Sequence, residues 1–198
     1  MSREERSTLM KFCQEQSLID LREGRITWPT RYMLVDLALY SGLRVMEIAD
    51  LNISDISFNS GHDPHIYVRH GKGNKKRTVY IDQELSNHLK EYIGYKEKTL
   101  HQSIHPDAPL FAGPTGKHCP INTFQKSFKV ATKKAGLRSH LSIHSCRHTY
   151  ATFLLHDTGN LRYVMSQLGH SNIAMTSLYA NILPEVNGRL ANMISRDV

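Results

Sequence analysis

The sequence predicts an α+β fold that is mostly helical and contains a small three-stranded antiparallel sheet near its N-terminal third. Three short segments, at residues 53–58, 65–70 and 77–81, are rich in β-branched residues and alternate between apolar and polar side chains, as strands do. Between them stand the turn sequences NSGHDP and GKGNKK. Most of the remaining chain follows helical periodicity, punctuated by glycines.

The first helices are expected ahead of the sheet. Residues 3–16 form a charged, modestly amphipathic segment, followed by an irregular stretch. Residues 29–40 are apolar on nearly every face after their first turn, which predicts a buried helix. Pro29 suits the first helical turn and Gly42 the position just past the helix end. A short helix is expected directly afterwards, in RVMEIADL.

After the sheet the chain returns to helices. Residues 83–98 are expected to be helical, LFAG to be a short extended piece and TGKHCP to be a loop. Further helices are predicted at residues 121–135, 144–157, 160–168, 172–180 and 185–194. Three glycines are expected as C-terminal caps of these helices: Gly136, Gly159 and Gly169.

Size and composition indicate a globular protein with a sizeable core. The chain has 198 residues, of which 40% are hydrophobic, and contains no apolar run long enough to span a membrane. Its charged N-terminus lacks the apolar region of a secretion signal. Three cysteines without a paired pattern suggest reduced thiols, so we expect a cytoplasmic protein.

The charge balance narrows the class of partner. Lysine and arginine exceed aspartate and glutamate by 25 − 18 = 7, and the isoelectric point is about 9.4. A basic chain without a membrane anchor favours a polyanionic partner, nucleic acid before a membrane surface. Because many basic proteins bind nothing acidic, the charge alone does not decide the matter.

Arg44 and Glu47 form the first candidate site. They lie three residues apart, on one face of the predicted short helix. A guanidinium that emerges from apolar surroundings has a planar anionic partner, which is either a carboxylate or a phosphate. The simpler interpretation is a surface ion pair between the two residues.

The turn before the third predicted strand is the second candidate. Between residues 69 and 77 stand five basic residues: Arg69, Lys72, Lys75, Lys76 and Arg77. Gly71 and Gly73 flank Lys72, so the turn can bring its backbone close to a ligand. Such a cationic tip suits a phosphate backbone, although a solvated turn is the commoner outcome for a lysine-rich hairpin.

The sequence IHSCRHTYATFLL supplies the third candidate. His144 and Arg147 share one helical face, so a base or donor stands beside a fixed positive charge. A zinc site is the competing interpretation, with the ligand types His140, His144, Cys146 and His148. It is disfavoured because no Cys-x-x-Cys pair is present and Cys146 points about 200° away from His144 around a helix.

The fourth candidate is LGHSNIAMTSLYAN, which contains His170 and Tyr179. Alone, Tyr179 would be interpreted as a core aromatic. Together, two arginines, a lysine, two histidines and a tyrosine make a coherent set for phosphoryl transfer without a metal. Fixed cations can stabilise the charge of a phosphate, and a tyrosine hydroxyl can attack when cations or a base assist it.

These segments resemble the catalytic domain of the tyrosine recombinases, the phage integrase family. The matching motifs follow one another in the family order: SGLRVMEIADLNISDI, VRHGKGNKKRTVYI, IHSCRHTYATFLL and LGHSNIAMTSLYAN. They span roughly residues 30–181. Each motif alone is weak, whereas four of them in order are highly specific.

The resemblance implies a role for each position. Arg44 and Arg147 correspond to the two catalytic arginines, His144 to the histidine of the His-x-x-Arg motif, and His170 to a donor to the scissile phosphate. Tyr179 corresponds to the nucleophile. Two further residues complete the set, Lys72 as the general acid and Glu47 as a carboxylate that supports the site from behind. Lys75 and Lys76 lie close enough to Lys72 to remain alternatives.

The resemblance also implies an organisation and partners. Residues 1–198 are expected to form a single catalytic domain, with an N-terminal helix and linker at 1–28 and a C-terminal tail helix at 184–198. The family's N-terminal core-binding domain is expected to be absent, and the sequence is then either an excised catalytic fragment or a naturally short recombinase. The tail either packs on its own domain or docks on a neighbouring protomer.

The implied function is site-specific DNA recombination through a covalent 3′-phosphotyrosyl intermediate, on double-stranded DNA, by a homo-oligomer of two to four protomers. Arg69, Lys75, Lys76 and Arg77 are the expected DNA contacts, and no cofactor or metal is expected. Two alternatives use the same fold: an accessory protein that binds DNA without cutting it, and an enzyme that relaxes supercoils by the same chemistry without strand exchange.

Overall fold

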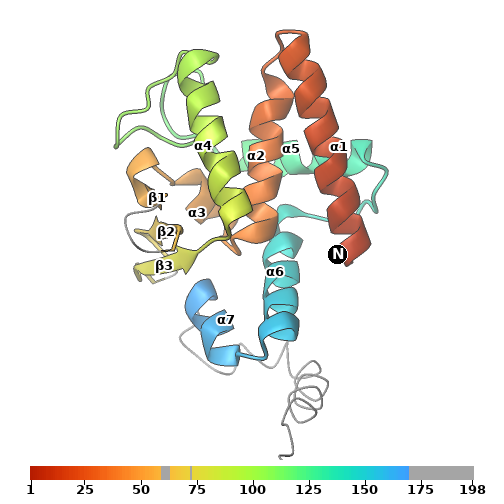
Figure 1. Cartoon of the computed structure of the whole chain (residues 1–198), viewed down its shortest axis with the longest axis vertical. Coiled ribbons are helices and arrows are strands. Elements are labelled where there is room, and N and C mark those ends of the chain that lie inside the picture. Colours follow the sequence, from red (N-terminus) through yellow and green to blue (C-terminus); the bar gives the residue numbers. More distant parts are fainter. Residues whose placement is uncertain (59–62, 72, 170–198) are drawn as a thin grey trace, which may run out of the picture.

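The computed structural model describes residues 1–58, 63–71 and 73–169 (Figure 1). Within them, the α-helices are α1 (Arg3–Arg22), α2 (Thr27–Tyr40), α3 (Val45–Ala49), α4 (Gln83–Lys98), α5 (Ile121–Lys134), α6 (Ile143–Thr158) and α7 (Leu161–Leu168). A 3₁₀ turn, η1 (Ile53–Asp55), precedes the sheet. The strands are β1 (Ile56–Ser57), β2 (His65–Val68) and β3 (Arg77–Tyr80). The α+β class, mostly helical, is confirmed.

The sheet has the predicted three antiparallel strands in the order β1-β2-β3. Ile66 is paired with Ile56 on one side and with Val79 on the other. These three side chains are buried, whereas Tyr67 and Tyr80, one position away from Ile66 and Val79, are exposed. The alternation in the sequence therefore becomes one face on the core and one face in solvent.

Helix α2 is the centre of the main core. Its residues from Met33 to Leu39 are all buried, which explains why the segment is apolar on nearly every face. It packs against α1, α4, α5 and α6. In Figure 1, α2 runs between α4 and α1, so it forms the floor between those two helices.

A second, smaller core joins α6 to α7. It is built from Ala151, Leu155, Val164 and Leu168, all at most 1% exposed. The first turns of α6 belong instead to the main core, through Ile143 and Cys146. Helix α6 thus connects the two cores, and α7 packs on β3 at the lower end of the view in Figure 1. This arrangement brings the ends of α6, α7 and the sheet together.

The expected bounds of the first helices were wrong. Helix α1 continues to Arg22, six residues beyond its predicted end, and α2 begins at Thr27 rather than Pro29. The buried Asp20 carboxylate organises the turn, because it accepts hydrogen bonds from the backbone N–H of Trp28 and from Arg25. Helix α3 is shorter than expected, ending at Ala49.

The later helices agree with their predicted bounds to within a residue or so. Gly159 and Gly169 adopt left-handed backbone angles at the C-caps of α6 and α7, as predicted. The helices expected at 172–180 and 185–194, including the tail helix at 184–198, lie outside the described residues. None of the described helices combines the length and the hydropathy that a membrane span requires.

Candidate active site

The Glu47 carboxylate lies at the centre of a cluster of arginines. Its side chain is only 2% exposed. Arg44 Nη1 lies 2.8 Å from Oε1, while Arg77 binds both oxygens, with Nη1 2.7 Å from Oε1 and Nη2 2.8 Å from Oε2. Arg147 Nη1 lies 3.8 Å from Oε2. One carboxylate on α3 therefore lies against guanidinium groups from three separate segments. We call Glu47 and these three arginines, Arg44, Arg77 and Arg147, the Glu47 cluster.

The Glu47 side chain is held in place because it caps the N-terminus of its own helix, α3. Arg44 is the N-cap of α3, and its backbone N–H donates to Glu47 Oε2 at 2.8 Å. Burial alone would raise the pKa of Glu47, but hydrogen bonds from Arg77 and from the Arg44 backbone outweigh it and lower the pKa to about 2. The carboxylate is therefore ionised throughout the physiological pH range. The ion pair of Arg44 with Glu47 is largely buried and is not the surface pair of the simpler interpretation.

Arg147 is held by backbone carbonyls as well as by charge. Its Nη1 donates to Gly42 O and its Nη2 to Leu168 O, each at 2.6 Å. The first carbonyl follows α2 and the second ends α7, so the guanidinium from α6 joins two distant segments. With 14% of its side chain exposed, Arg147 has a defined orientation in a largely buried site.

The charges of the cluster do not balance. Counting the described residues, three guanidinium groups face one carboxylate, a net charge of 3 − 1 = +2. The Arg44 side chain keeps 23% of its surface exposed. Concentrated positive charge beside a low-dielectric core attracts an anion. The cluster therefore has the charge to attract an anionic group such as a phosphate diester.

The basic turn between β2 and β3 divides into a tip and a base. Lys75 and Lys76 are exposed at the tip, as a DNA contact requires. Arg69 lies at the base, where its Nε is 2.9 Å from Asp55 Oδ1 and its Nη2 donates to the Asp50 carbonyl. Its guanidinium is thus used within the protein.

Arg77 differs most from its expected place. It was predicted to contact DNA with the turn, yet its side chain is 9% exposed and lies against Glu47. The sequence contained a signal for this, because Arg77 and the buried Val79 are two positions apart on one strand and so share a face. The base of the hairpin points this arginine inward, and its position in the cluster was not anticipated.

Helix α6 separates the residues of the zinc hypothesis. His144 and His148 are exposed, whereas Cys146 is fully buried and burial raises the pKa of its thiol. Among the described residues, no three His, Cys, Asp or Glu side chains come together as metal ligands. His144 lies on α6 about one helical turn before Arg147, which is a member of the Glu47 cluster.

The other predicted site residues cannot be placed in the same way. Lys72, His170 and Tyr179 lie outside the described residues. Their neighbours Gly71 and Gly169 are described, and a Cβ atom added at either would lie within 3.3 Å of Arg77. The structure therefore brings together Arg44, Glu47 and Arg147 as the sequence predicted, and adds Arg77 to them.

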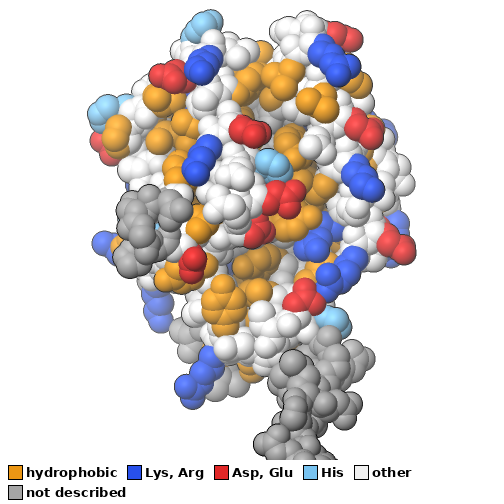
Figure 2. Space-filling model, in the orientation of Figure 1, with side chains coloured by type: hydrophobic (Ala, Val, Ile, Leu, Met, Phe, Trp, Pro, Cys, Tyr) orange, Lys and Arg blue, Asp and Glu red, His pale blue; other side chains and the backbone are white. Residues whose placement is uncertain are grey.

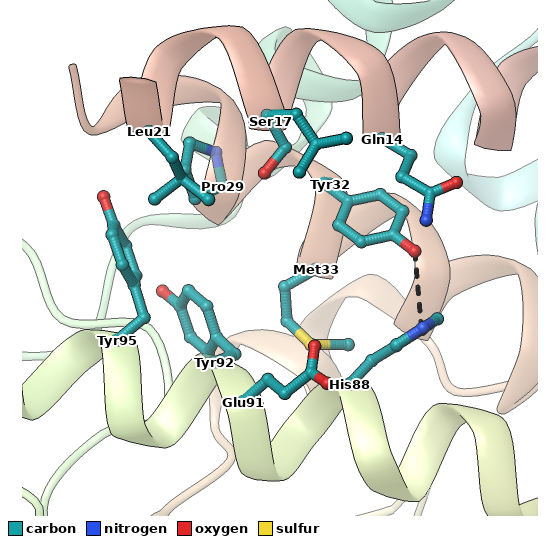
Figure 3. A pocket seen from close by; sticks show the side chains of 11 residues that line it. Gln14, Ser17, Leu21, Pro29, Tyr32, Met33, His88, Glu91, Tyr92 and Tyr95 are labelled. Atoms are coloured by element: carbon teal, nitrogen blue, oxygen red, sulfur yellow. Dashed lines mark hydrogen bonds between the residues drawn. The ribbon is translucent and has the colours of Figure 1, made fainter. Parts of the chain in front are cut away.

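A separate hollow lies between α1 and α4, over α2 (Figure 2). It measures about 200 Å³ and is lined by tyrosines and apolar side chains, among them Tyr32, Met33, Tyr92 and Tyr95 (Figure 3). His88 borders it, with Nδ1 2.7 Å from the buried Asp36 carboxylate. The lining contains no lysine or arginine, so the hollow is unsuited to a phosphate.

Comparison with known proteins agrees with the site. The model of the phage integrase family matches residues 1–185. Tyrosine recombinase XerC of Lactobacillus delbrueckii subsp. bulgaricus is 29% identical over 167 residues, which cover 84% of this chain and 55% of the relative. Tyrosine recombinase XerC of Proteus mirabilis is 32% identical over 149 residues, covering 75% of this chain and 46% of the relative.

Solved structures have the same fold. The XerA recombinase superimposes with a TM-score of 0.74 at 26% identity, over 99% of this chain and 65% of that structure. The XerH recombinase bound to difH in a pre-cleavage complex gives a TM-score of 0.75 at 22% identity, over 98% and 53%. The chain spans about half the length of the curated relatives it matches. By its sequence and its fold, the chain belongs to the phage integrase family, as a tyrosine recombinase catalytic domain.

Proposed function

We propose that this protein is a site-specific DNA recombinase that cuts and rejoins strands through a 3′-phosphotyrosyl bond. The observation that supports this most directly is the Glu47 cluster, in which three arginines share one buried carboxylate. Its excess positive charge suits a single backbone phosphate. The family membership supports the same chemistry.

In the proposed reaction, Tyr179 Oη attacks the scissile phosphorus and passes its hydroxyl proton to a base, for which His144 is the candidate. A phosphorus–oxygen bond to the tyrosine forms while the bond to the 5′ oxygen breaks, and Lys72 donates a proton to that leaving oxygen. Arg44 and Arg147 stabilise the negative charge on the nonbridging oxygens, together with His144 and His170. The phosphotyrosine ester conserves the energy of the broken phosphodiester bond. A 5′ hydroxyl can therefore reverse the step without ATP.

The exposed tip of the β2–β3 turn is the proposed phosphate contact beside the reaction. Lys75 and Lys76 are both exposed there. Each backbone phosphate neutralised by a lysine releases counterions, so binding should weaken steeply with salt. Arg69 and Arg77 are occupied by carboxylates within the protein and are assigned to the base of the turn instead.

We further propose that the chain acts as one catalytic unit over residues 1–198, in the cytoplasm, and that two to four protomers assemble on double-stranded DNA. The solved relatives support DNA as the partner: one is a XerH recombinase bound to difH, and another is a lambda integrase dimer bound to a core site. Recombination joins two DNA sites, so at least two protomers are required.

Covalent trapping tests the nucleophile. The probe is a pool of nicked duplexes of randomised sequence, in which cleavage beside the nick releases a short fragment and prevents religation. We expect the wild type to form a denaturation-resistant protein–DNA adduct and Tyr179→Phe to form none. Tyr80→Phe is the matched control, because Tyr80 is an exposed tyrosine on β3 and should leave the adduct unchanged.

The outcomes separate the alternatives. Equal adduct from the wild type and Tyr179→Phe would show that another residue is the nucleophile. A gel shift without any adduct would favour the accessory protein that binds DNA without cutting it. An adduct accompanied by plasmid relaxation, but without recombinant products, would favour the enzyme that only relaxes supercoils.

A further inference from the structure

We propose that Arg77 is a positioning residue for strand cleavage, which holds the β2–β3 turn and the end of α7 against the Glu47 carboxylate. The inference rests on the proposed function, since it assigns Arg77 to the geometry of that reaction. The residue lies at the start of β3 and contacts no group expected to react. Its importance lies in what it joins.

All three nitrogens of the Arg77 guanidinium have protein partners. Nη1 and Nη2 bind the two oxygens of Glu47 at 2.7 and 2.8 Å, and Nε donates to Gln167 O at 2.9 Å. The side chain therefore links β3 to α3 and to the last turn of α7. A two-point contact with a carboxylate fixes both the position and the plane of the group.

Two glycines, Gly71 and Gly169, lie next to the Arg77 side chain. A Cβ atom added at Gly169 would stand 2.8 Å from Arg77 Cδ, and one added at Gly71 would stand 3.3 Å from Arg77 Nη1 and 2.6 Å from the Lys75 carbonyl. At Gly169 the obstruction is Arg77 itself, whereas at Gly71 it is chiefly the Lys75 carbonyl, with Arg77 Nη1 as a second close neighbour. The backbone of two distant segments therefore lies beside the Arg77 side chain, more closely at Gly169 than at Gly71.

Each of these glycines immediately precedes, in the sequence, a residue proposed for the reaction. Gly71 is followed by Lys72 and Gly169 by His170. The same Arg77 guanidinium also fixes Glu47, which binds Arg44. Arg77 therefore lies beside the residues that directly precede Lys72 and His170. It also orients Arg44 indirectly, because both arginines bind the Glu47 carboxylate.

Lysine cannot replace arginine in this position. Its single ammonium group is a point donor and cannot bind both Glu47 oxygens and Gln167 O in the fixed geometry of a guanidinium. We therefore expect Arg77→Lys to preserve the charge but slow adduct formation by about a hundredfold, since misplacement by about 1 Å can have that effect. Arg25→Lys, which alters an ion-paired arginine outside the cluster, should react at the wild-type rate.

A pair of glycine variants tests the contact without changing Arg77. Gly169→Ala and Gly24→Ala impose the same backbone strain, because the two glycines have φ of +64° and +67°. Only the first presses on Arg77, since nothing lies within 4 Å of a Cβ at Gly24. We expect Gly169→Ala to slow adduct formation about tenfold and Gly24→Ala to leave it unchanged. The effects of Gly169→Ala and Arg77→Lys should not add, because both act on one contact.

Amide hydrogen exchange provides a readout independent of cleavage. The Gly71 N–H donates to Lys75 O at 3.0 Å and the Gly169 N–H to Ser166 O at 3.1 Å. In Arg77→Lys, both amides should exchange at least tenfold faster, while the amides of α4 keep wild-type protection. Leu89→Ala, a truncation of a fully buried residue on α4, controls for general loss of stability at a temperature where every variant is folded.

The outcomes are distinct. Wild-type adduct rates in Arg77→Lys, or wild-type protection of Gly71 and Gly169, would overturn the proposal. It would also be overturned if Leu89→Ala were slowed as much as Arg77→Lys. A wild type that forms no adduct would overturn the proposed function alone, because the exchange experiment still reports on Arg77.

Discussion

Arg69 and Arg77 flank the same turn and have opposite surroundings. Arg69 follows β2 and lies near two carboxylates, with Asp55 Oδ1 2.9 Å from Nε and Asp50 Oδ2 3.6 Å from Nη2, a local charge of 1 − 2 = −1. Arg77 begins β3 and belongs to the Glu47 cluster, where three guanidinium groups face one carboxylate. The carboxylates around Arg69 more than neutralise its charge, whereas the Glu47 cluster keeps a net positive charge.

The balance of charged partners, and not the residue type, therefore separates a structural arginine from one in an anion site. Both arginines anchor the turn from its base. Of these two regions, as far as the described residues show, the cluster around Arg77 is the one with more guanidinium groups than carboxylates, and its other two arginines are those that the motifs had indicated.

Removing the charge of Glu47 should have the greatest effect on stability. Glu47→Gln keeps the size of the side chain but leaves buried guanidinium groups without a carboxylate. We expect the free energy of unfolding to fall by about 3–5 kcal/mol, the usual result of breaking a buried ion pair. Urea denaturation measures it. A loss of less than about 1 kcal/mol, typical of surface pairs, would contradict the importance of the cluster.

Acid should act on the same carboxylate. The pKa of Glu47 is lowered from 4.5 to about 2, so its contribution to stability is complete above pH 4.5 and is lost as the pH falls towards 2. The corresponding loss in the free energy of unfolding is about 3 kcal/mol. Denaturation curves across this range should show that loss in the wild type and not in Glu47→Gln. Because the pKa of Glu5 also lies near 2, Glu5→Gln serves as a control and should retain the Glu47 slope.

Changing Arg69 should have a smaller effect than changing Glu47. Arg69→Met removes one guanidinium from two carboxylates, of which Asp50 is about half exposed and Asp55 still accepts a hydrogen bond from the Asn52 backbone. We expect the free energy of unfolding to fall by about 1–3 kcal/mol, measured by urea denaturation. A loss as large as that of Glu47→Gln would remove the contrast between the two regions.

The smallest effect is expected at the hollow between α1 and α4. A hydrogen bond to Asp36 raises the pKa of His88 above 6.5, and burial opposes the rise. This contact therefore stabilises the fold fully below pH 6.5 and is lost as the pH rises through the raised pKa. The midpoint of thermal unfolding should fall over that range in the wild type. The loss should be absent in His88→Gln, whereas the Glu47 cluster should be insensitive to pH in this range.

Much of the fold could be predicted because its signals are local. The alternation of Ile66, Tyr67 and Val68 is a property of a few adjacent residues, and so is the glycine at the end of α6. The end of α1 could not be predicted in this way. It depends on Asp20, a charged residue of ordinary helical sequence that is buried because it caps the backbone at Trp28.

The site divides along the same line. Motif order indicated Arg44, Glu47 and Arg147, and the structure joins them. The membership of Arg77 was missed because its neighbours in sequence are lysines of an exposed turn, which made it resemble another surface cation. Only the pairing of β3 with β2, and the packing of α7 on β3, turns that side chain towards Glu47.

Local sequence signals were enough for most of the secondary structure outside the first helices, for the family and for the chemical types available to bind a phosphate. The tertiary structure decided which cations share a carboxylate and which are neutralised. The physical reason is that periodicity and turn preferences act between neighbours, whereas the energy of a charge depends on burial and on partners tens of residues away. Glu47 meets Arg44 within one helical turn, but it meets Arg77 and Arg147 only after the chain has folded.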